Sequence, residues 1–174
     1  MKIKLSSVED APNISQYYID NALHFSIWEP IKDDGYDKIE SWEERLKERE
    51  IEQNIKIGAY FLAYQKDSKE IIATCNLTGI TYGAFLACYM GYSISSAFEG
   101  QGKMKKLCTH ATQYAFQELG LHRIMANYMP NNKRSESLLS RMGFNKEGFA
   151  EKYLKINGKW EDHVLTSLIN NEST

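Results

Sequence analysis

The pattern of hydrophobic and polar positions changes character near residue 58. Before it, apolar side chains recur every three or four residues in two segments, 8–25 and 38–55, which is the spacing of one helical face. After it, short apolar runs separated by polar or glycine-containing turns are typical of strands. The sequence therefore predicts two helices followed by a sheet.

The two predicted helices differ in how much of their surface is apolar. The first begins at the capping residue Asp10, with Pro12 in its first turn. Its apolar positions are Ile14, Tyr17 or Tyr18, Ala22 and Phe25. The second is heavily charged, and we expect its charges to face solvent. Its single stripe comprises Ile39, Trp42, Leu46, Ile51 and Ile55.

The strands alternate with helices after residue 94. Strands are predicted over 59–80, as a pair joined at the turn "QKDSKE", and over 85–95. Gly91 inside the latter indicates a bulge or a place where a ligand comes close. A helix ended by Gly120, a strand at 122–129, a short helix ended by Gly143 and two long strands turning at Asn157-Gly158 follow. This order predicts a mixed α/β sheet, with a parallel pair within 86–128.

Length and composition describe one ordinary globular domain, residues 1–174, with no linker. The net charge of −2 gives no reason to expect nucleic-acid binding. Cys75, Cys88 and Cys108 lack a zinc-binding spacing, so we expect buried free thiols and no metal site. No apolar run is long enough for a signal peptide or a membrane span. We expect a soluble cytoplasmic protein.

The stretch "EGQGKMKK", residues 99–106, contains the strongest chemical signal. Gly100 and Gly102 let the main chain fold around a ligand at a helix start without a side chain in the way. Unpaired N–H groups and the helix dipole attract an anion there. Lysines at 103, 105 and 106 disfavour the helix by up to about 1 kcal/mol each, unless they neutralise a phosphate. Taken alone, the turn is better explained as a plain helix start with solvated lysines.

"EGQGKM", Glu99 to Met104, resembles the central motif of the GCN5-related N-acetyltransferases (GNAT), Gln/Arg-x-x-Gly-x-Gly/Ala, which binds the pyrophosphate of acetyl-CoA. Glu99 stands in place of the usual Gln or Arg, and Met104 in place of the small residue. We expect Glu99 to point away from the phosphates and Met104 to pack into the core. Their effect on coenzyme A affinity is left open.

The segment 122–166, with "RIMANYMPNNKRS" as its most specific part, is similar to the RimJ type of ribosomal-protein-alanine N-acetyltransferase. The resemblance implies an α/β (α+β) GNAT fold, with a mostly antiparallel sheet split between strands 4 and 5 and flanked by helices. It implies that acetyl-CoA lies in the split. The implied cofactor-binding residues are Tyr92, Ile94, Gly100, Gln101, Gly102, Lys103, Met104, Asn127, Asn132 and Ser135.

The resemblance also implies catalytic roles. Asn132 and Ser135 fit the family's Asn-x-x-Ser, in which the Asn binds pantetheine and the Ser protonates the leaving thiolate; by sequence alone they fit a helix cap and a first-turn serine as well. A main-chain N–H near Gly91 is expected to polarise the thioester carbonyl. Glu151 is the favoured general base, ahead of Glu147 and His163. Leu154 is an alternative occupant of the matching position.

The resemblance also implies that the loop between the first two predicted helices forms a wall of the acceptor site. It carries Trp28 and four acidic residues, Glu29, Asp33, Asp34 and Asp37. Negative charge there suits a cationic amine or a basic protein tail, although a solvated acidic loop is an equal interpretation.

The leading functional hypothesis is an acetyl-CoA-dependent transfer to the N-terminal amine, Ala or Ser, of a protein, most simply a ribosomal protein. Two alternatives are a small-amine acetyltransferase, acting on a polyamine or an aminoglycoside, and a non-catalytic acyl-CoA-binding or ribosome-associated module. The acceptor, the base and the oligomeric state, with a homodimer as one arrangement, are left open.

Overall fold

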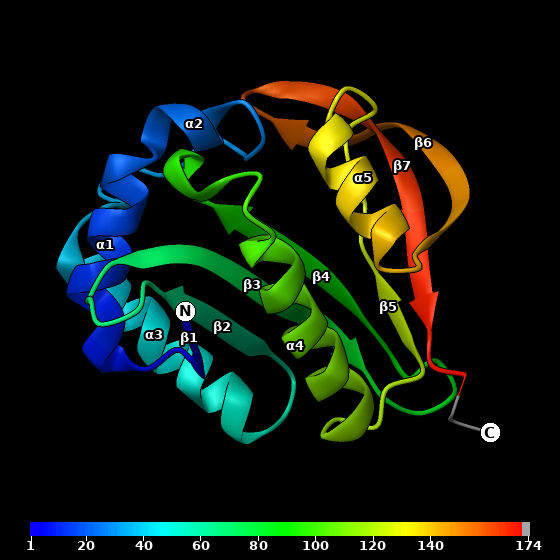
Figure 1. Ribbon diagram of the computed structural model, residues 1–174, viewed down its shortest axis with the longest axis horizontal. Helices are drawn as coiled ribbons and strands as arrows, with labels where there is room; N and C mark the ends of the chain where they lie inside the picture. Colours follow the sequence, from blue (N-terminus) through cyan, green and yellow to red (C-terminus); the bar gives the residue numbers. More distant parts are fainter. Residues whose placement is uncertain (172–174) are drawn as a thin grey trace.

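A single seven-stranded sheet forms the centre of the computed structural model, which describes residues 1–171 (Figure 1). The strand order is β1-β2-β3-β4-β5-β7-β6, and every neighbouring pair is antiparallel except β4–β5. The strands are β1 (Lys2–Leu5), β2 (Ala59–Tyr64), β3 (Ile71–Thr81), β4 (Ala87–Ile94), β5 (Arg123–Met125), β6 (Asn145–Ile156) and β7 (Lys159–Ile169). The predicted fold class, a mixed and mostly antiparallel sheet flanked by helices, is confirmed.

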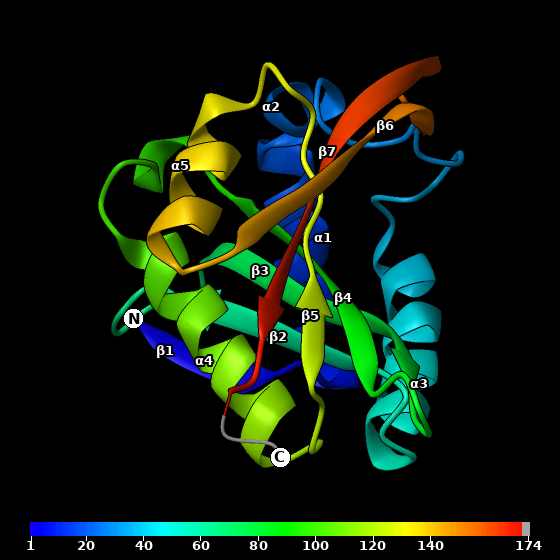
Figure 2. The same cartoon turned by 90° about the vertical axis from the view of Figure 1, so that its right-hand side faces the viewer.

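Helices cover the two sides of the sheet unequally. Figure 2 shows α4 (Lys103–Gln117) and α5 (Lys133–Arg141) on one side and α1 (Ala11–Asp20), α2 (Ala22–Ser26) and α3 (Ile39–Asn54) on the other. The larger apolar core lies beneath α4, around Phe61, Leu77 and Leu107. A smaller core beneath α1 and α3 contains Trp42 and Leu46.

The sheet is split between β4 and β5. The two strands pair only from Ala87 to Tyr89, opposite Arg123 to Met125. Beyond that point the chain after β5 turns to β7, where the N–H groups of Ala126 and Tyr128 donate to the carbonyls of Thr166 and Val164. Within residues 1–171 the second half of β4 therefore has no strand partner on this side, as the resemblance implied.

The helices follow the predicted starts but not all of the predicted faces. Asp10 is the N-cap of α1, and Pro12 lies in its first turn. The helix breaks at buried Asn21, whose amide donates to the Tyr17 carbonyl, and this break turns Ala22 outward. On α3 only Trp42 and Leu46 of the predicted stripe are buried. Ile39, Ile51 and Ile55 are exposed, because both ends of this helix extend past the small core.

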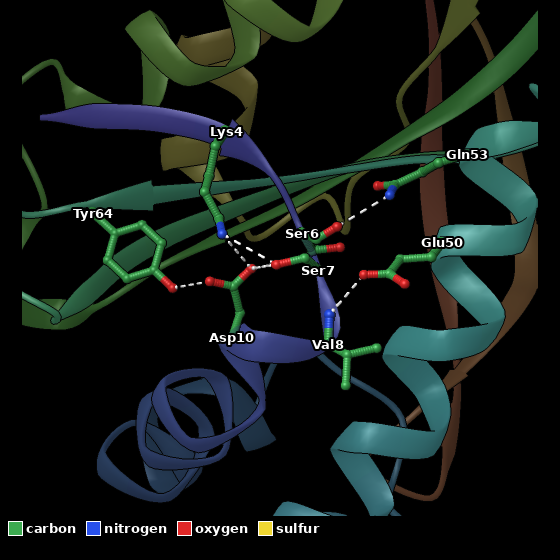
Figure 3. A network of polar contacts seen from close by, with 8 residues as sticks. All are labelled: Lys4, Ser6, Ser7, Val8, Asp10, Glu50, Gln53 and Tyr64. Atoms are coloured by element: carbon green, nitrogen blue, oxygen red, sulfur yellow. Dashed lines mark hydrogen bonds and ion pairs between the residues drawn. The ribbon is translucent and has the colours of Figure 1, made fainter.

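Strand β1 was not predicted, and a polar network connects it to the neighbouring elements (Figure 3). The Asp10 carboxylate contacts the Lys4 ammonium at 2.8 Å and accepts from the Tyr64 hydroxyl at 2.5 Å and the Ser7 N–H at 2.8 Å. Burial alone raises the pKa of Asp10, but the bonds from Lys4, Tyr64 and Ser7 together outweigh it and lower that pKa. The network fixes the start of α1 against β2.

The β6–β7 hairpin turns at Asn157 (φ 44°) and Gly158 (φ 79°), as predicted. The Asn157 N–H donates to the carbonyl of Glu29 at 3.0 Å, so the hairpin tip lies against the loop after α2. Within residues 1–171 no helix is long and apolar enough to cross a membrane.

Candidate functional site

A cavity of about 970 Å³ opens where β4 and β5 part. It extends from the start of α4, past β4 and α5, to the loop after α2 and the tip of the β6–β7 hairpin. The structure brings together here most of the predicted cofactor-binding residues: Tyr92, Ile94, Gly100, Gly102, Lys103, Met104, Asn127, Asn132 and Ser135.

The glycine turn presents bare main chain to this cavity. Gly100 (φ 71°) and Gly102 (φ 72°) adopt the left-handed conformation that other residues rarely tolerate, and Gly102 is the N-cap of α4. A Cβ built on either glycine would meet no protein atom within 4 Å. The space is therefore open for a ligand, directly before the free N–H groups of the helix.

Lys103 contributes positive charge beside this turn. Its ammonium lies 4.1 Å from the centre of the Phe98 ring and 3.5 Å from the Gln65 side-chain oxygen. Lys105 also lines the cavity, whereas Lys106 lies on a separate surface depression. Two of the three lysines thus face the site that the turn forms.

Gly91 lies in a regular part of β4, so the first interpretation of this glycine, a bulge, is wrong. It pairs in register with Asn76 of β3, while the irregularity in this strand pair falls between Thr78 and Thr81. A Cβ at Gly91 would meet nothing within 4 Å. The absent side chain therefore leaves open space in the cavity wall, which is the second interpretation that the sequence allowed.

The start of α5 combines the two interpretations of Asn132. Asn132 caps α5, because its side-chain oxygen accepts a hydrogen bond from the Ser135 N–H at 3.1 Å. Both residues also line the cavity. Across the cavity, burial raises the pKa of the Tyr92 phenol well above its usual range, while a hydrogen bond with the Ser135 hydroxyl opposes the rise. Ser135 therefore has a neutral proton-bearing neighbour at physiological pH.

Asn127 connects the chain after β5 to the hairpin. Its side-chain oxygen accepts the Thr166 N–H at 3.3 Å, and its amide lies 3.5 Å from the Tyr153 hydroxyl. It lines the cavity from the β5 side of the split.

Glu99 lines the cavity, and its expected orientation away from the phosphates stays a prediction. Its carboxylate lies 3.3 Å from the His24 imidazole of α2 and also contacts the Arg134 guanidinium of α5. All three residues line the cavity, so Glu99 connects two helices across its rim. Met104, in contrast, is buried in the larger core as expected.

Three predicted residues lie outside the cavity lining. Gln101 is exposed, and its amide donates to the Ala97 carbonyl at 3.0 Å. Glu151 is exposed on β6, where the pairing register shifts between Ala150 and Leu154. Glu147 pairs with Ser167 and Arg123, which lower the pKa of its carboxyl. The structure thus does not bring either glutamate to the split.

The structure places other residues where a base was expected. Leu154 and His163 both line the cavity. His163 is buried; its Nδ1 lies 3.0 Å from the Glu161 carbonyl, and its ring centre lies 5.6 Å from that of Tyr153. Of the three base candidates named from the sequence, His163 is the one placed at the cavity.

The acidic loop is divided by the fold. Trp28 and Glu29 line the cavity, whereas Asp33, Asp34 and Asp37 do not. The residues that sequence reasoning missed come from elements far apart in the chain, and no local motif marks them. They include Tyr18, His24, Tyr36, Arg49 and Asn76.

Three features of the cavity fit coenzyme A. Glycines leave main chain exposed in its wall, lysines at the start of α4 make one end basic, and the edge of β4 at the split is unpaired within residues 1–171. Gly91, Gly100 and Gly102 leave the space, and Lys103 and Lys105 supply the charge. Among residues 1–171, no group of three or more His, Cys, Asp or Glu side chains is arranged to hold a metal ion. Absence of a metal requirement stays a prediction.

Comparison with known proteins adds a family and close structural neighbours. A family model described as an acetyltransferase (GNAT) domain matches residues 3–145. The ribosomal protein uS5-alanine N-acetyltransferase of Escherichia coli K12 is 43% identical over 168 residues, which are 95% of this chain and 86% of the relative.

Two solved structures share the whole architecture. The ribosomal-protein-S5-alanine acetyltransferase of Vibrio fischeri superposes with a TM-score of 0.96 at 37% identity, covering 99% of this chain and 94% of that one. Mycobacterium smegmatis RimJ, in complex with CoA-disulfide, superposes with a TM-score of 0.90 at 25% identity, covering 98% and 82%.

Proposed function

The chain belongs to the GNAT family of acetyltransferases, and we propose that it transfers the acetyl group of acetyl-CoA to the N-terminal α-amine of a ribosomal protein, an alanine or a serine. The family and the use of acetyl-CoA, both predicted from the sequence, are confirmed. The identity of the acceptor is supported by the similarity to the Escherichia coli enzyme over nearly the whole chain. The proposed reaction takes place in the cytoplasm, with newly made ribosomal proteins as the acceptors.

The observation that carries the proposal is a cavity at the split whose two ends differ in chemistry. One end has free main-chain N–H groups and lysines for a diphosphate. The other end has a carboxylate and aromatic rings from the loop after α2, which suit a cationic amine. Acetyl-CoA supplies the activated acyl group, and the split is where the two reactants meet.

The side chains at the split have distinct tasks in this proposal. Asn132 and Asn127 bind the pantetheine arm, and the hydroxyl of Ser135 holds the proton that the departing thiolate requires. An α-amine titrates near pH 7.7–8.0, so a weak base suffices to take its proton. In this proposal His163, which is buried and lines the cavity, takes that proton. A homodimer stays a prediction.

Purified protein, acetyl-CoA and two acceptors test the proposal. We expect acetylation of the N-terminal peptide of uS5 and little of spermidine, measured by thiol release and by mass spectrometry of the peptide. Ribosomal proteins from cells with and without the gene provide the second measurement. An unchanged acetylation pattern in the cells, together with transfer to spermidine alone, would replace this function by small-amine acetylation. No thiol release with either acceptor would favour the non-catalytic module.

A further inference from the structure

The face of the split opposite α4 is the face open to an acceptor. The Tyr17 hydroxyl of α1 bonds with Ser93 of β4 at 2.9 Å, so Ser93 points to the α1 side of the sheet. Gly91 points to the same side, because alternate strand residues share a face. The phosphate turn precedes α4 on the opposite side, and two reactants cannot occupy one space. The acceptor therefore approaches from the α1 side.

This face has a buried polar atom without a partner. Asn76 lies directly opposite Gly91 in the strand register and shares its face. The side-chain oxygen of Asn76 is buried and has no hydrogen-bond donor within residues 1–171. An unsatisfied buried acceptor is destabilising, and a ligand that carries N–H groups would relieve this cost.

The same cavity contains a cation site that the protein fills with its own side chain. The ammonium of Lys32 is 2.8 Å from Glu29 Oε2, 4.7 Å from the centre of the Tyr36 ring and 5.7 Å from that of Tyr18. Tyr18 is held in place by stacking on Trp42, with ring centres 5.0 Å apart. A carboxylate beside two aromatic faces is a binding site for an ammonium group.

The contact between Glu29 and Lys32 joins a buried oxygen to a partly exposed side chain. Glu29 Oε2 is buried, and its contact with the Lys32 ammonium is an ion pair. The Lys32 side chain is about one third exposed, at 36%, and ends a flexible four-carbon stem. Its ammonium can therefore move towards solvent. Glu29, in contrast, is held by the hydrogen bond that its carbonyl accepts from the Asn157 N–H of the hairpin.

We propose that Glu29, with the ring faces of Tyr18 and Tyr36, forms the subsite that binds the α-ammonium group of the acceptor, and that Lys32 occupies this subsite until the acceptor displaces it. The inference rests on the proposed function and deepens it, because it names the side chains that select a cationic amine. Glu29 is thereby separated from the other acidic residues of its loop, which lie outside the cavity.

Three single variants test the subsite with acetyl-CoA and the N-terminal peptide of Escherichia coli uS5. Glu29→Gln keeps the size of the side chain and removes its charge, and we expect the KM for the peptide to rise about 10-fold. Lys32→Met removes the competing ammonium, and we expect this KM to fall about 3-fold. Asp34→Asn removes a charge from the same loop outside the cavity and should change neither KM nor kcat.

A pair of non-reactive peptides separates recognition of charge from general damage. One is the uS5 peptide with an N,N-dimethylated terminal amine, which remains a cation but cannot be acetylated; the other lacks the terminal amino group. We expect the wild type to bind the cationic peptide more tightly by about 10-fold in calorimetry, and Glu29→Gln to bind the two alike. Coenzyme A affinity serves as the folding control and should be equal in all variants.

The outcomes distinguish this inference from the function on which it rests. If the wild type acetylates the peptide and Glu29→Gln retains its KM and its preference for the cationic peptide, the subsite is refuted and the function stands. If Lys32→Met raises KM instead, Lys32 contributes to acceptor binding, and the proposal that the acceptor displaces Lys32 is refuted. A wild type that is inert towards the peptide refutes the function, and the subsite with it.

Discussion

The two ends of the cavity are built differently, one from main chain and one from side chains. The cofactor end consists of the Gly100–Gly102 turn and the start of α5, each a short continuous segment. The acceptor end is assembled from α1, the loop after α2, α3, β3 and the hairpin. A site made of main chain needs a particular local conformation, which glycine and capping residues reveal. A site made of side chains depends on which distant elements meet.

This difference predicts that damage at one end leaves the other intact. Substitutions in the turn should weaken coenzyme A and spare the acceptor, and substitutions on the α1 side should do the reverse. The predictions below test that separation, from the largest expected effect to the smallest.

Gly102→Val should weaken coenzyme A binding about 100-fold in calorimetry, because a branched side chain both fills the open space before α4 and resists the left-handed conformation. Gly120→Val is the matched control, since Gly120 (φ 64°) has the same strained conformation and the same open surroundings at the other end of α4. Both variants should lose thermal stability, and only the first should lose coenzyme A. Equal losses of affinity would show that strain alone is being measured.

Ser135→Ala should lower kcat about 30-fold with coenzyme A affinity changed little. The effect falls below the usual range for general acids because a thiolate leaves readily. Steady-state kinetics with the uS5 peptide measure it, and Ser140→Ala, on the exposed side of the same helix, is the control. A kcat unaffected by Ser135→Ala would assign the proton to another group, with Tyr92 next to be tested.

Asp10→Asn should lower the free energy of unfolding by about 1.5 kcal/mol near neutral pH, because it removes the charge that pairs with Lys4. Folding lowers the pKa of Asp10, so its stabilisation is present above the ordinary value of 3.8 and is lost as the pH falls below it. The difference between wild type and variant should therefore shrink in urea titrations at acid pH. Coenzyme A affinity should persist, since the network lies on the α1 side; a loss would contradict the separation of the two ends.

Glu99→Gln should tighten coenzyme A binding about 3-fold, the smallest of these effects, because it removes a negative charge from the cavity rim and frees Arg134. Calorimetry at low and high salt measures it, and the gain should diminish as salt screens the charge. Weaker binding in the variant would mean that Glu99 holds His24 and Arg134 where the cofactor requires them.

The part of the site that sequence reasoning found is the part that needs special main-chain conformations. Gly100, Gly102 and Asn132 each lie at a helix start, where few residue types suit the geometry. Glu151 was favoured from the family resemblance, but the pairing register shifts between Ala150 and Leu154, and Leu154 reaches the cavity instead. Four steps along β6 here oppose two along β7, and no local motif announces such an irregularity.

The helices show the same limit. Trp42 and Leu46 are buried as predicted, yet Ile51 is 60% exposed on the same stripe. Periodicity gives the face of a helix but not the length over which a partner covers it. For the same reason the acidic loop could not be divided into Glu29 and the rest, since that division depends on the hairpin contact from Asn157.

That contact joins residues 128 positions apart in the chain, and it sets a limit on when the acceptor end can exist. Leu154, Lys155 and Ile156, which close the cavity there, belong to the last strand pair. While the chain is being translated, the glycine turn and α4 emerge well before this hairpin. The acceptor end can therefore form only after the β6–β7 hairpin has been synthesised, later than the glycine turn of the nucleotide-binding end.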